Sequence, residues 1–243
     1  MKHNLMGLLL VTAVIILTTG CINQLNVGPV QTDEETVETG DINTARVNIQ
    51  MGVGKLDING GAAGLLDAEF TYNVEEWKPE VDYKISGSEG RLTVQQPEGK
   101  TGSVGIPDTD KVKNEWDLKL NDDVPLDLDI NLGVGESDLE LSGLTLNSLD
   151  IQTGVGETTI DLTGDWASSF DVDIKGGVGQ TTVRLPSGVG VRVETQTGIG
   201  GINVQNLIRN GDTYTNAAYE GADVVLDIKV QGGVGAIDLI LEE

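Results

Sequence analysis

The sequence predicts an all-β protein whose strands stack in parallel as a solenoid with short glycine-rich corners. First, apolar and polar residues alternate from about residue 41 onward, as in Leu126, Leu128 and Ile130 against Asp127 and Asp129. Such alternation places one side chain in a core and the next in water. Second, no stretch beyond the first twenty residues shows a sustained helical stripe. Third, a glycine–aliphatic–glycine triplet occurs seven times, at 52–54, 133–135, 154–156, 177–179, 188–190, 198–200 and 233–235.

The spacing of the triplets favours stacking. Those that begin at 133, 154, 177, 198 and 233 are 21, 23, 21 and 35 residues apart, a period typical of stacked repeats. In each repeat we expect one strand to enter the triplet and a second to leave it. Glycine accepts positive φ and allows close approach of neighbouring backbones, and the residue between the glycines is expected to point inward.

A sandwich of hairpins is the alternative architecture. Hairpin turns favour Asn-Gly or Asp-Gly pairs. Only Asn59-Gly60 and Asn210-Gly211 occur, so the stacked arrangement is preferred.

The folded part divides by texture into a first β domain at 41–125 and a repeat domain at 126–243. The first domain contains one triplet and two of the three tryptophans, Trp77 and Trp116. Its sequence leaves open whether the two domains share one core. We expect strands over Arg46–Gln50, Lys55–Ile58, Leu66–Asn73, Val81–Ile85 and Arg91–Gln96, followed by a looser stretch at 97–113.

The N-terminus is predicted to be a signal peptide, residues 1–20, followed by a lipid anchor. An almost unbroken apolar run, Leu5 to Leu17, is too short to span a bilayer but suits a signal-peptide core. Small residues then precede Cys21, the only cysteine, as in a bacterial lipobox, although Leu17 stands one position further from the cysteine than usual. Ordinary cleavage with a free thiol is the alternative. Residues 21–40 are acidic and without periodicity, and predict a disordered tether.

The charge excludes nucleic acid as a partner. The formal net charge is −24, and such a surface is repelled by phosphate backbones and anionic headgroups. It leaves open attraction to cationic peptides, or a surface that is charged only for solubility.

Four segments of the first domain carry a recognisable pattern: 47–62 (VNIQMGVGKLDINGGA), 65–72 (LLDAEFTY), 78–81 (KPEV) and 92–97 (LTVQQP). These segments resemble the N-terminal toast-rack domain of secreted bacterial proteins. The repeats after 126 are similar to the related β-stacked C-terminal domains of Lia-type cell-wall-active antibiotic response proteins and of proteins classed as adhesins. The resemblance implies a parallel β-stack at the cell envelope and brings no catalytic residues. Lia-type proteins anchor through several membrane helices, whereas this chain has at most a lipid.

Several catalytic and metal chemistries are excluded by the residue inventory. The single histidine, His3, leaves with the signal, and Cys21 is occupied once lipidated. No catalytic triad, Cys–His pair, or zinc, haem or iron–sulfur site can be built without imidazole and thiol. Paired carboxylates could still hydrolyse glycans, but only nine aromatic residues are present to form sugar platforms. No catalytic residue, metal site or cofactor is therefore predicted.

The Gly-Gly-Val-Gly runs do not predict calcium or nucleotide sites. Calcium-binding nonapeptides need an aspartate where Thr181 and Ile237 stand. Incidental calcium between Asp127, Asp129 and Asp150 is the weaker alternative to plain solvated charge. No helix follows the glycines to bind phosphate.

Three aromatic residues in inter-strand loops are the candidate partner contacts: Trp166, Tyr214 and Tyr219. The alternative is that they cap the core locally. We expect a non-enzymatic, lipid-anchored envelope interaction module, in stress response or adhesion, whose partner is an envelope protein, wall glycan or cationic peptide. The competing classes are a self-associating structural protein with an open end rung as its contact, and a carboxylate-based glycan enzyme.

Overall fold

The computed structural model describes residues 27–97 and 111–242, and within them it confirms the all-β prediction. Thirteen strands form one mixed sheet, and a single 3₁₀ turn, η1 (Glu75–Trp77), interrupts them. The strands are β1 (Val27–Val37), β2 (Thr44–Gly60), β3 (Leu66–Val74), β4 (Glu80–Ser86), β5 (Glu89–Gln95), β6 (Asn114–Leu120), β7 (Leu126–Glu140), β8 (Leu146–Asp161), β9 (Phe170–Leu185), β10 (Gly190–Gln205), β11 (Ile208–Asn210), β12 (Thr213–Thr215) and β13 (Val225–Leu241).

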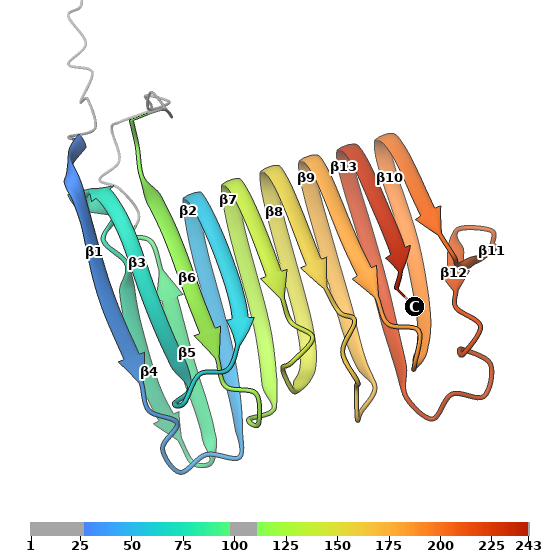
Figure 1. Ribbon diagram of the computed structural model, residues 1–243, viewed down its shortest axis with the longest axis horizontal. Helices are drawn as coiled ribbons and strands as arrows, with labels where there is room; N and C mark the ends of the chain where they lie inside the picture. Colours follow the sequence, from blue (N-terminus) through green and yellow to red (C-terminus); the bar gives the residue numbers. More distant parts are fainter. Residues whose placement is uncertain (1–26, 98–110, 243) are drawn as a thin grey trace, which may run out of the picture.

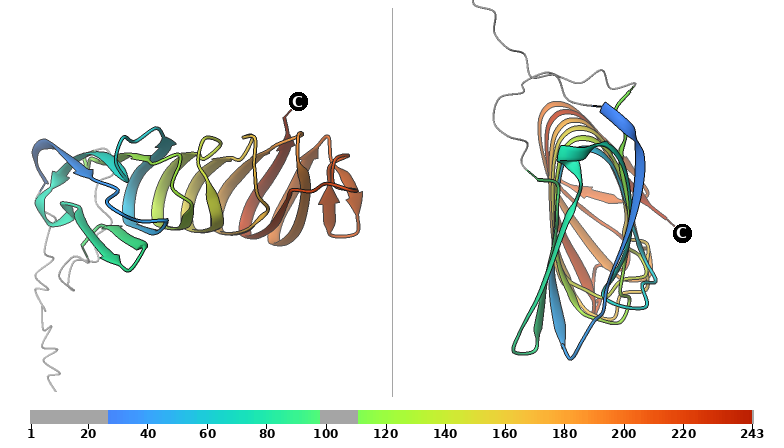
Figure 2. Two further views of the ribbon diagram at one scale, coloured as in Figure 1. Left: turned by 90° about the horizontal axis from the view of Figure 1, so that it is seen from below. Right: turned by 90° about the vertical axis from the view of Figure 1, so that its left-hand side faces the viewer.

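Six long strands, β2, β7, β8, β9, β13 and β10, stack side by side in parallel. Each folds over at its middle, so that its two arms face one another across a narrow core (Figures 1 and 2). Six of the seven triplets lie at these bends, inside continuous strands. The prediction of two strands joined by a corner is therefore corrected to one bent strand per repeat. In the seventh triplet, Gly188 and Val189 lie in the loop that leads into β10, and Gly190 is the first residue of that strand.

Glycine is required at the bends because neighbouring backbones lie in contact there. Gly135 and Gly156 have φ values of +149° and +145°. A Cβ added to Gly156 would overlap the carbonyl oxygen of Gly135, and one added to Gly135 would overlap that of Gly54. The predicted reason for the glycines, close approach with positive φ, is confirmed.

The aliphatic residue between the glycines points outward, which corrects the prediction that it fills the corner. Val134 and Val155 are 47% and 50% exposed. The inward positions on β7 are Leu132 before the bend and Ser137 after it, so four consecutive residues lie on the outside. The strict alternation on which the prediction rested does not continue through the bend.

The order of the last two long strands differs from the order of the chain. The C-terminal strand β13 lies between β9 and β10 and pairs in parallel with both. The chain leaves β10 through the β11–β12 hairpin, which pairs with Arg192–Glu194 of β10, and returns to fill the slot. This excursion accounts for the 35-residue spacing between the last two triplets.

The first part of the chain extends the stack with shorter strands. The arms of β2 pair with two separate strands, the N-terminal arm with β5 and the C-terminal arm with β6. From β6 the sheet continues through β3 to β1, and from β5 to β4. The expected strands correspond to β2–β5, whereas β6 was not predicted.

The prediction of a disordered tether over 21–40 is wrong for 27–37. These residues form β1, which pairs antiparallel with β3 at the end of the sheet. Most of its side chains are exposed, so it lacks the alternating pattern of a half-buried strand. Residues 21–26 of the predicted tether, like the predicted signal peptide and Cys21, lie outside the described residues.

The two predicted domains share one sheet and one core. Strand β2 pairs with β7 over Ala45–Ile58, across the boundary expected at 125. One cluster of buried residues runs from Ala45 through Trp116 and Leu126 to Leu239.

Candidate interaction surface

The predicted contact residues Trp166 and Tyr214 are buried, which corrects their proposed exposure. Trp166 is 7% exposed, donates its indole N–H to the carbonyl oxygen of Leu162 at 2.9 Å, and meets the ring of Phe170 edge-on at 4.7 Å. Tyr214 is 5% exposed on β12. Both rings therefore close the core, which was the alternative interpretation of these residues.

Tyr219 is half-buried in the segment that returns from β12 to β13, and its role as a contact stays a prediction. This segment is fastened by Asn216, which is 3% exposed. Its side-chain amide donates to the carbonyl oxygen of Val189 at 2.7 Å and accepts from the backbone N–H of Val191 at 3.0 Å. The excursion beyond β10 is thus tied to the main stack.

Outward side chains of the N-terminal arms stand in straight columns, one residue from each stacked strand. Because parallel strands lie about 4.8 Å apart, residues in register form a ladder. One such ladder carries Asp129, Asp150 and Asp173 on β7, β8 and β9. Asp127 and Asp171 lie two residues before Asp129 and Asp173. We call these five residues the aspartate patch.

Basic side chains flank the aspartate patch. Arg46 on β2 approaches Asp127 at 3.7 Å, and Lys175 approaches Asp173 at 3.1 Å. On the far side, Arg192 of β10 bonds Asp227 of the neighbouring β13 at 2.7 Å, and this carboxylate raises the pKa of Arg192. The middle of the face is therefore the acidic part. Like charges in register are destabilising, so folding alone does not favour this arrangement.

The bends form a second surface, which we call the aliphatic ridge. It consists of one residue per stacked strand, in register along the whole stack. Five of the six residues are exposed, from 46% at Val234 to 74% at Ile199, and Val53 is half-buried. The sequence contained the signal, the aliphatic residue of each triplet, but period-two reasoning placed it inside. The ridge residues are Val53, Val134, Val155, Val178, Val234 and Ile199.

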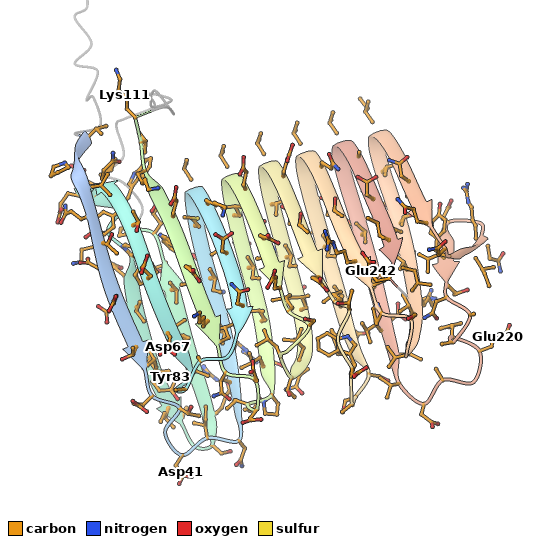
Figure 3. The ribbon with its side chains drawn as sticks, viewed as in Figure 1. Asp41, Asp67, Tyr83, Lys111, Glu220 and Glu242 are labelled. Atoms are coloured by element: carbon orange, nitrogen blue, oxygen red, sulfur yellow. The ribbon has the colours of Figure 1, made fainter. Side chains whose placement is uncertain are left out.

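The edge opposite the ridge is acidic. It consists of the loops and strand ends, and Figure 3 shows Asp41 and Glu220 at this lower edge, whereas Lys111 lies at the upper edge. Exposed acidic residues of this lower edge are Glu38, Asp41, Asp123, Asp165, Glu220, Asp223 and Glu242. The stack is therefore polarised between its two edges.

A carboxylate fastens the first strand of the sheet. Asp33 of β1 accepts hydrogen bonds at 2.8 Å from the Tyr72 hydroxyl of β3 and from the Lys78 ammonium. Lys78 and Tyr72 hold the pKa of Asp33 below its ordinary value. Burial and the hydrogen bond to Asp33 raise the pKa of Tyr72.

No metal-binding group was found in the described ranges, 27–97 and 111–242, where no three or more Asp, Glu, His or Cys side chains are placed to hold an ion. Of the aspartates considered for incidental calcium, Asp127 is engaged by Arg46 and Asp129 accepts from Asn131 at 2.6 Å. The same ranges contain no helix long and apolar enough to cross a bilayer.

Two family models match the chain. The N-terminal domain of toast_rack matches residues 26–184, and the C-terminal domain of LiaF, a cell wall-active antibiotics response protein, matches residues 133–239. The first match crosses residue 125, in agreement with the continuous sheet, and the two matches overlap at 133–184. Comparison with curated proteins gives no match.

Solved structures of bacterial proteins are also similar. A Clostridium sporogenes protein, named as a candidate cell adhesion protein, is 32% identical with a TM-score of 0.84, over 88% of this chain and 100% of that one. Candidate adhesins from Bacteroides fragilis and Parabacteroides distasonis are 12% and 14% identical, with TM-scores of 0.23 and 0.24. They cover 87% and 88% of this chain, and 97% and 98% of their own. By its first-domain match and by its likeness to the Clostridium protein, the chain belongs to the toast-rack family.

Proposed function

We propose that this protein is a lipid-anchored envelope module that acts by non-covalent contact and not by catalysis. The observation that carries the proposal is the arrangement of the charged side chains: they stand in columns on the outward faces of the sheet, and the hollow on the aspartate-bearing face is lined by Arg192 and Lys229 as well as by carboxylates. An enzyme for glycans would need two carboxylates facing one another across a groove. The aspartate patch instead lies along one face of the sheet, with its carboxylates all presented to the same side.

The anchor of this proposal is Cys21, after removal of residues 1–20. The matched families support a place at the cell envelope, through the names of the LiaF model and the Clostridium adhesion protein. Envelope stress response and adhesion are the two settings that those names suggest.

The partner is proposed to carry positive charge where it meets the face. Five aspartates within three neighbouring strands attract cations, and the rest of the chain is acidic as well. An envelope protein with a basic segment and a cationic peptide both fit this chemistry. A neutral wall glycan would gain nothing from it.

Binding of an oligolysine peptide tests the proposal in solution. The variant Asp129→Asn/Asp150→Asn/Asp173→Asn removes three charges from the patch. The control Glu34→Gln/Glu35→Gln/Glu38→Gln removes three from β1 and the segment after it. We expect the patch variant to bind several-fold more weakly, with a shallower dependence on salt, because local charges attract more strongly than distant screened ones. Equal losses of peptide binding in both variants would show that the patch contributes only to the general negative charge of the chain, and would contradict the proposal.

Self-association is the second candidate function, and the end of the stack favours it. The C-terminal arm of β10, Gly198–Gln205, pairs with β13 on one side, and no strand among the described residues pairs with its other side. Residues 196–208 contain no charged side chain. An uncharged open edge can pair with another chain. Sedimentation of the parent and of Asn203→Lys tests this, since only a dimer formed through this edge would dissociate in the variant.

A further inference from the structure

We propose that the aliphatic ridge rests on the membrane that holds the lipid anchor, so that the stack lies along the bilayer with its acidic edge outward. The inference rests on the proposed anchoring through Cys21. The partner of the aliphatic ridge is then the lipid surface itself. This contact gives a function to apolar side chains that the fold leaves exposed.

The position of the first described residue supports this orientation. Val27 pairs with Val74 at the end of β3, beyond Tyr72, which pairs with Asn114. Asn114 precedes Glu115, which pairs with Lys55 directly after the first bend. Val27 therefore lies at the level of the bends, at the upper edge in Figure 1.

The length of chain before Val27 limits how far the anchor can lie from this edge. Val27 is six residues beyond Cys21, and a fully extended chain of this length spans at most about 22 Å. Strand β3, whose two ends pair with the two ends of β1, runs eight residue steps from Leu66 to Val74 and is about 26 Å long. With the acidic edge against the membrane, Val27 would stand about the length of β3 away, beyond the reach of the anchor.

The ridge has the shape and polarity for an interfacial contact. Six strands at about 4.8 Å spacing give a line of aliphatic side chains about 24 Å long. A hollow beside its first residue is lined by Val53, Trp77, Val112 and Val134, with Lys55, Lys113, Glu115 and Glu136 also at its wall. Contiguous exposed apolar surface of this kind marks an interaction site.

The charge beside the ridge is balanced, unlike that of the whole chain. The column before the ridge consists of Gln50, Asn131, Gln152, Lys175, Gln231 and Gln196. The column after it consists of Lys55, Glu136, Glu157, Gln180, Ala236 and Gly201. Two lysines offset two glutamates. Near the same edge Lys78 pairs with Asp33 and Lys113 with Glu115, and the neighbouring Glu75 and Glu76 are exposed, so the ridge suits a bilayer surface without strong negative charge.

Either broad face of the stack is a poorer membrane contact. The N-terminal arms carry the aspartate patch, and the C-terminal arms carry Glu136, Asp138 and Glu140 on β7 alone. The ridge by itself is weakly apolar, because valine is small and half-buried. The lipid anchor is the first contact with the membrane and holds the ridge near the bilayer. The contact between ridge and bilayer then becomes intramolecular, so that even a weak affinity is effective.

Thiol accessibility in cells tests the orientation. After lipidation the parent chain has no free thiol, because Cys21 is its only cysteine. Val155→Cys places a thiol on the ridge, and Ser187→Cys places one in an exposed loop at the opposite edge. Both variants are treated with membrane-impermeant polyethylene glycol maleimide, once in intact membranes and once after the membranes have been solubilised with detergent.

We expect the Val155→Cys thiol to react several-fold more slowly in membranes than in detergent, and the Ser187→Cys thiol to react at the same rate in both. Equal rates for the two variants in membranes would overturn the inference. Protection of the Val155→Cys thiol from maleimide that persists in detergent but decreases on dilution of the protein would also overturn the inference. That result would show that a second copy of the chain covers the ridge.

A parent chain that reacts with the maleimide would show that the lipidation proposal has failed. The orientation is then tested with a chemical anchor, by coupling the Cys21 thiol of the mature chain to a maleimide phospholipid in phosphatidylcholine vesicles. Brominated lipid tails should quench the added fluorescence of Val155→Trp and leave that of Ser187→Trp unchanged. Equal quenching would overturn the inference under this anchor as well.

Discussion

At the scale of single residues, the bends are the most demanding positions in the chain. Gly156 combines positive φ with a backbone contact, since the carbonyl oxygen of Gly135 occupies the place of a Cβ. Gly188 belongs to a triplet of the same sequence type, yet no atom lies within 4 Å of its Cβ position and it has no positive φ.

Gly156→Ala is therefore predicted to lower the free energy of unfolding by about 2 kcal/mol or more, because backbone strain and overlap add. Gly188→Ala is the matched control and is expected to leave the free energy within about 0.5 kcal/mol of the parent. Urea unfolding measures both. Similar losses in the two variants would show that the triplets matter through composition and not through the bend.

Asn216 is the second critical residue, because its side chain satisfies backbone groups on both sides of the loop before β10. Asn216→Ala should cost about 1–3 kcal/mol, the cost of leaving buried polar groups unpaired. Exposed Asn147, with one bond at 3.4 Å, provides the control Asn147→Ala. If calorimetry gives the same small change for both, Asn216 does not fasten the excursion.

At the scale of elements, the fixing of β1 should depend on pH. The folded-state pKa of Asp33 lies below its unfolded value, so the stabilisation is fully present above the unfolded value of about 3.9. It is lost as the pH falls through the lower, folded value. We predict that hydrogen exchange of the β1 amides, corrected for the intrinsic rate, accelerates in that acidic range before that of β8.

The variant Asp33→Asn provides the control for this prediction. It should show fast exchange in β1 already at neutral pH, with no further acid step. A β1 that stays protected in the variant would place its stability in backbone pairing with β3 alone.

The elements also show which parts of the fold the sequence could predict. Alternation located β2–β5 and the arms of the long strands, because one face of each is more buried than the other, although β4 has no fully buried residue. It missed β1, whose two faces are mostly exposed, and it reversed the ridge valines, because alternation breaks at the bend. The insertion of β13 between β9 and β10 leaves no mark in local pattern, since parallel pairing depends on residues 35 positions apart.

The candidate surface was predictable only in part. The negative charge and the outward aspartates were evident from composition and alternation. The apolar ridge was not recognised because its residues lie within the glycine triplets. Trp166 and Tyr214 were expected to be exposed in loops, but both are buried in the core. Loop position does not predict burial when a loop folds back over an open end.

At the scale of the whole molecule, the continuous sheet predicts one unfolding transition. Trp77 and Trp116 lie in the first part and Trp166 in the repeats, so Trp166→Phe and Trp77→Phe/Trp116→Phe isolate probes of each part. Since β2 and β7 pair across residue 125, both fluorescence transitions should coincide with that of circular dichroism. Two separated midpoints would instead support independent domains, as linear repeats sometimes allow.

The central claim is that the anchored stack works by presenting its aspartate-bearing face to a partner. The most direct measurement is photo-cross-linking in native cells under cell-wall antibiotic stress, with p-benzoylphenylalanine at position 150 in the aspartate patch or at position 220 on the acidic edge. We predict one dominant partner protein with basic surface residues cross-linked from position 150 and absent from position 220. The same products from both positions, or only products of the chain with itself, would contradict the account.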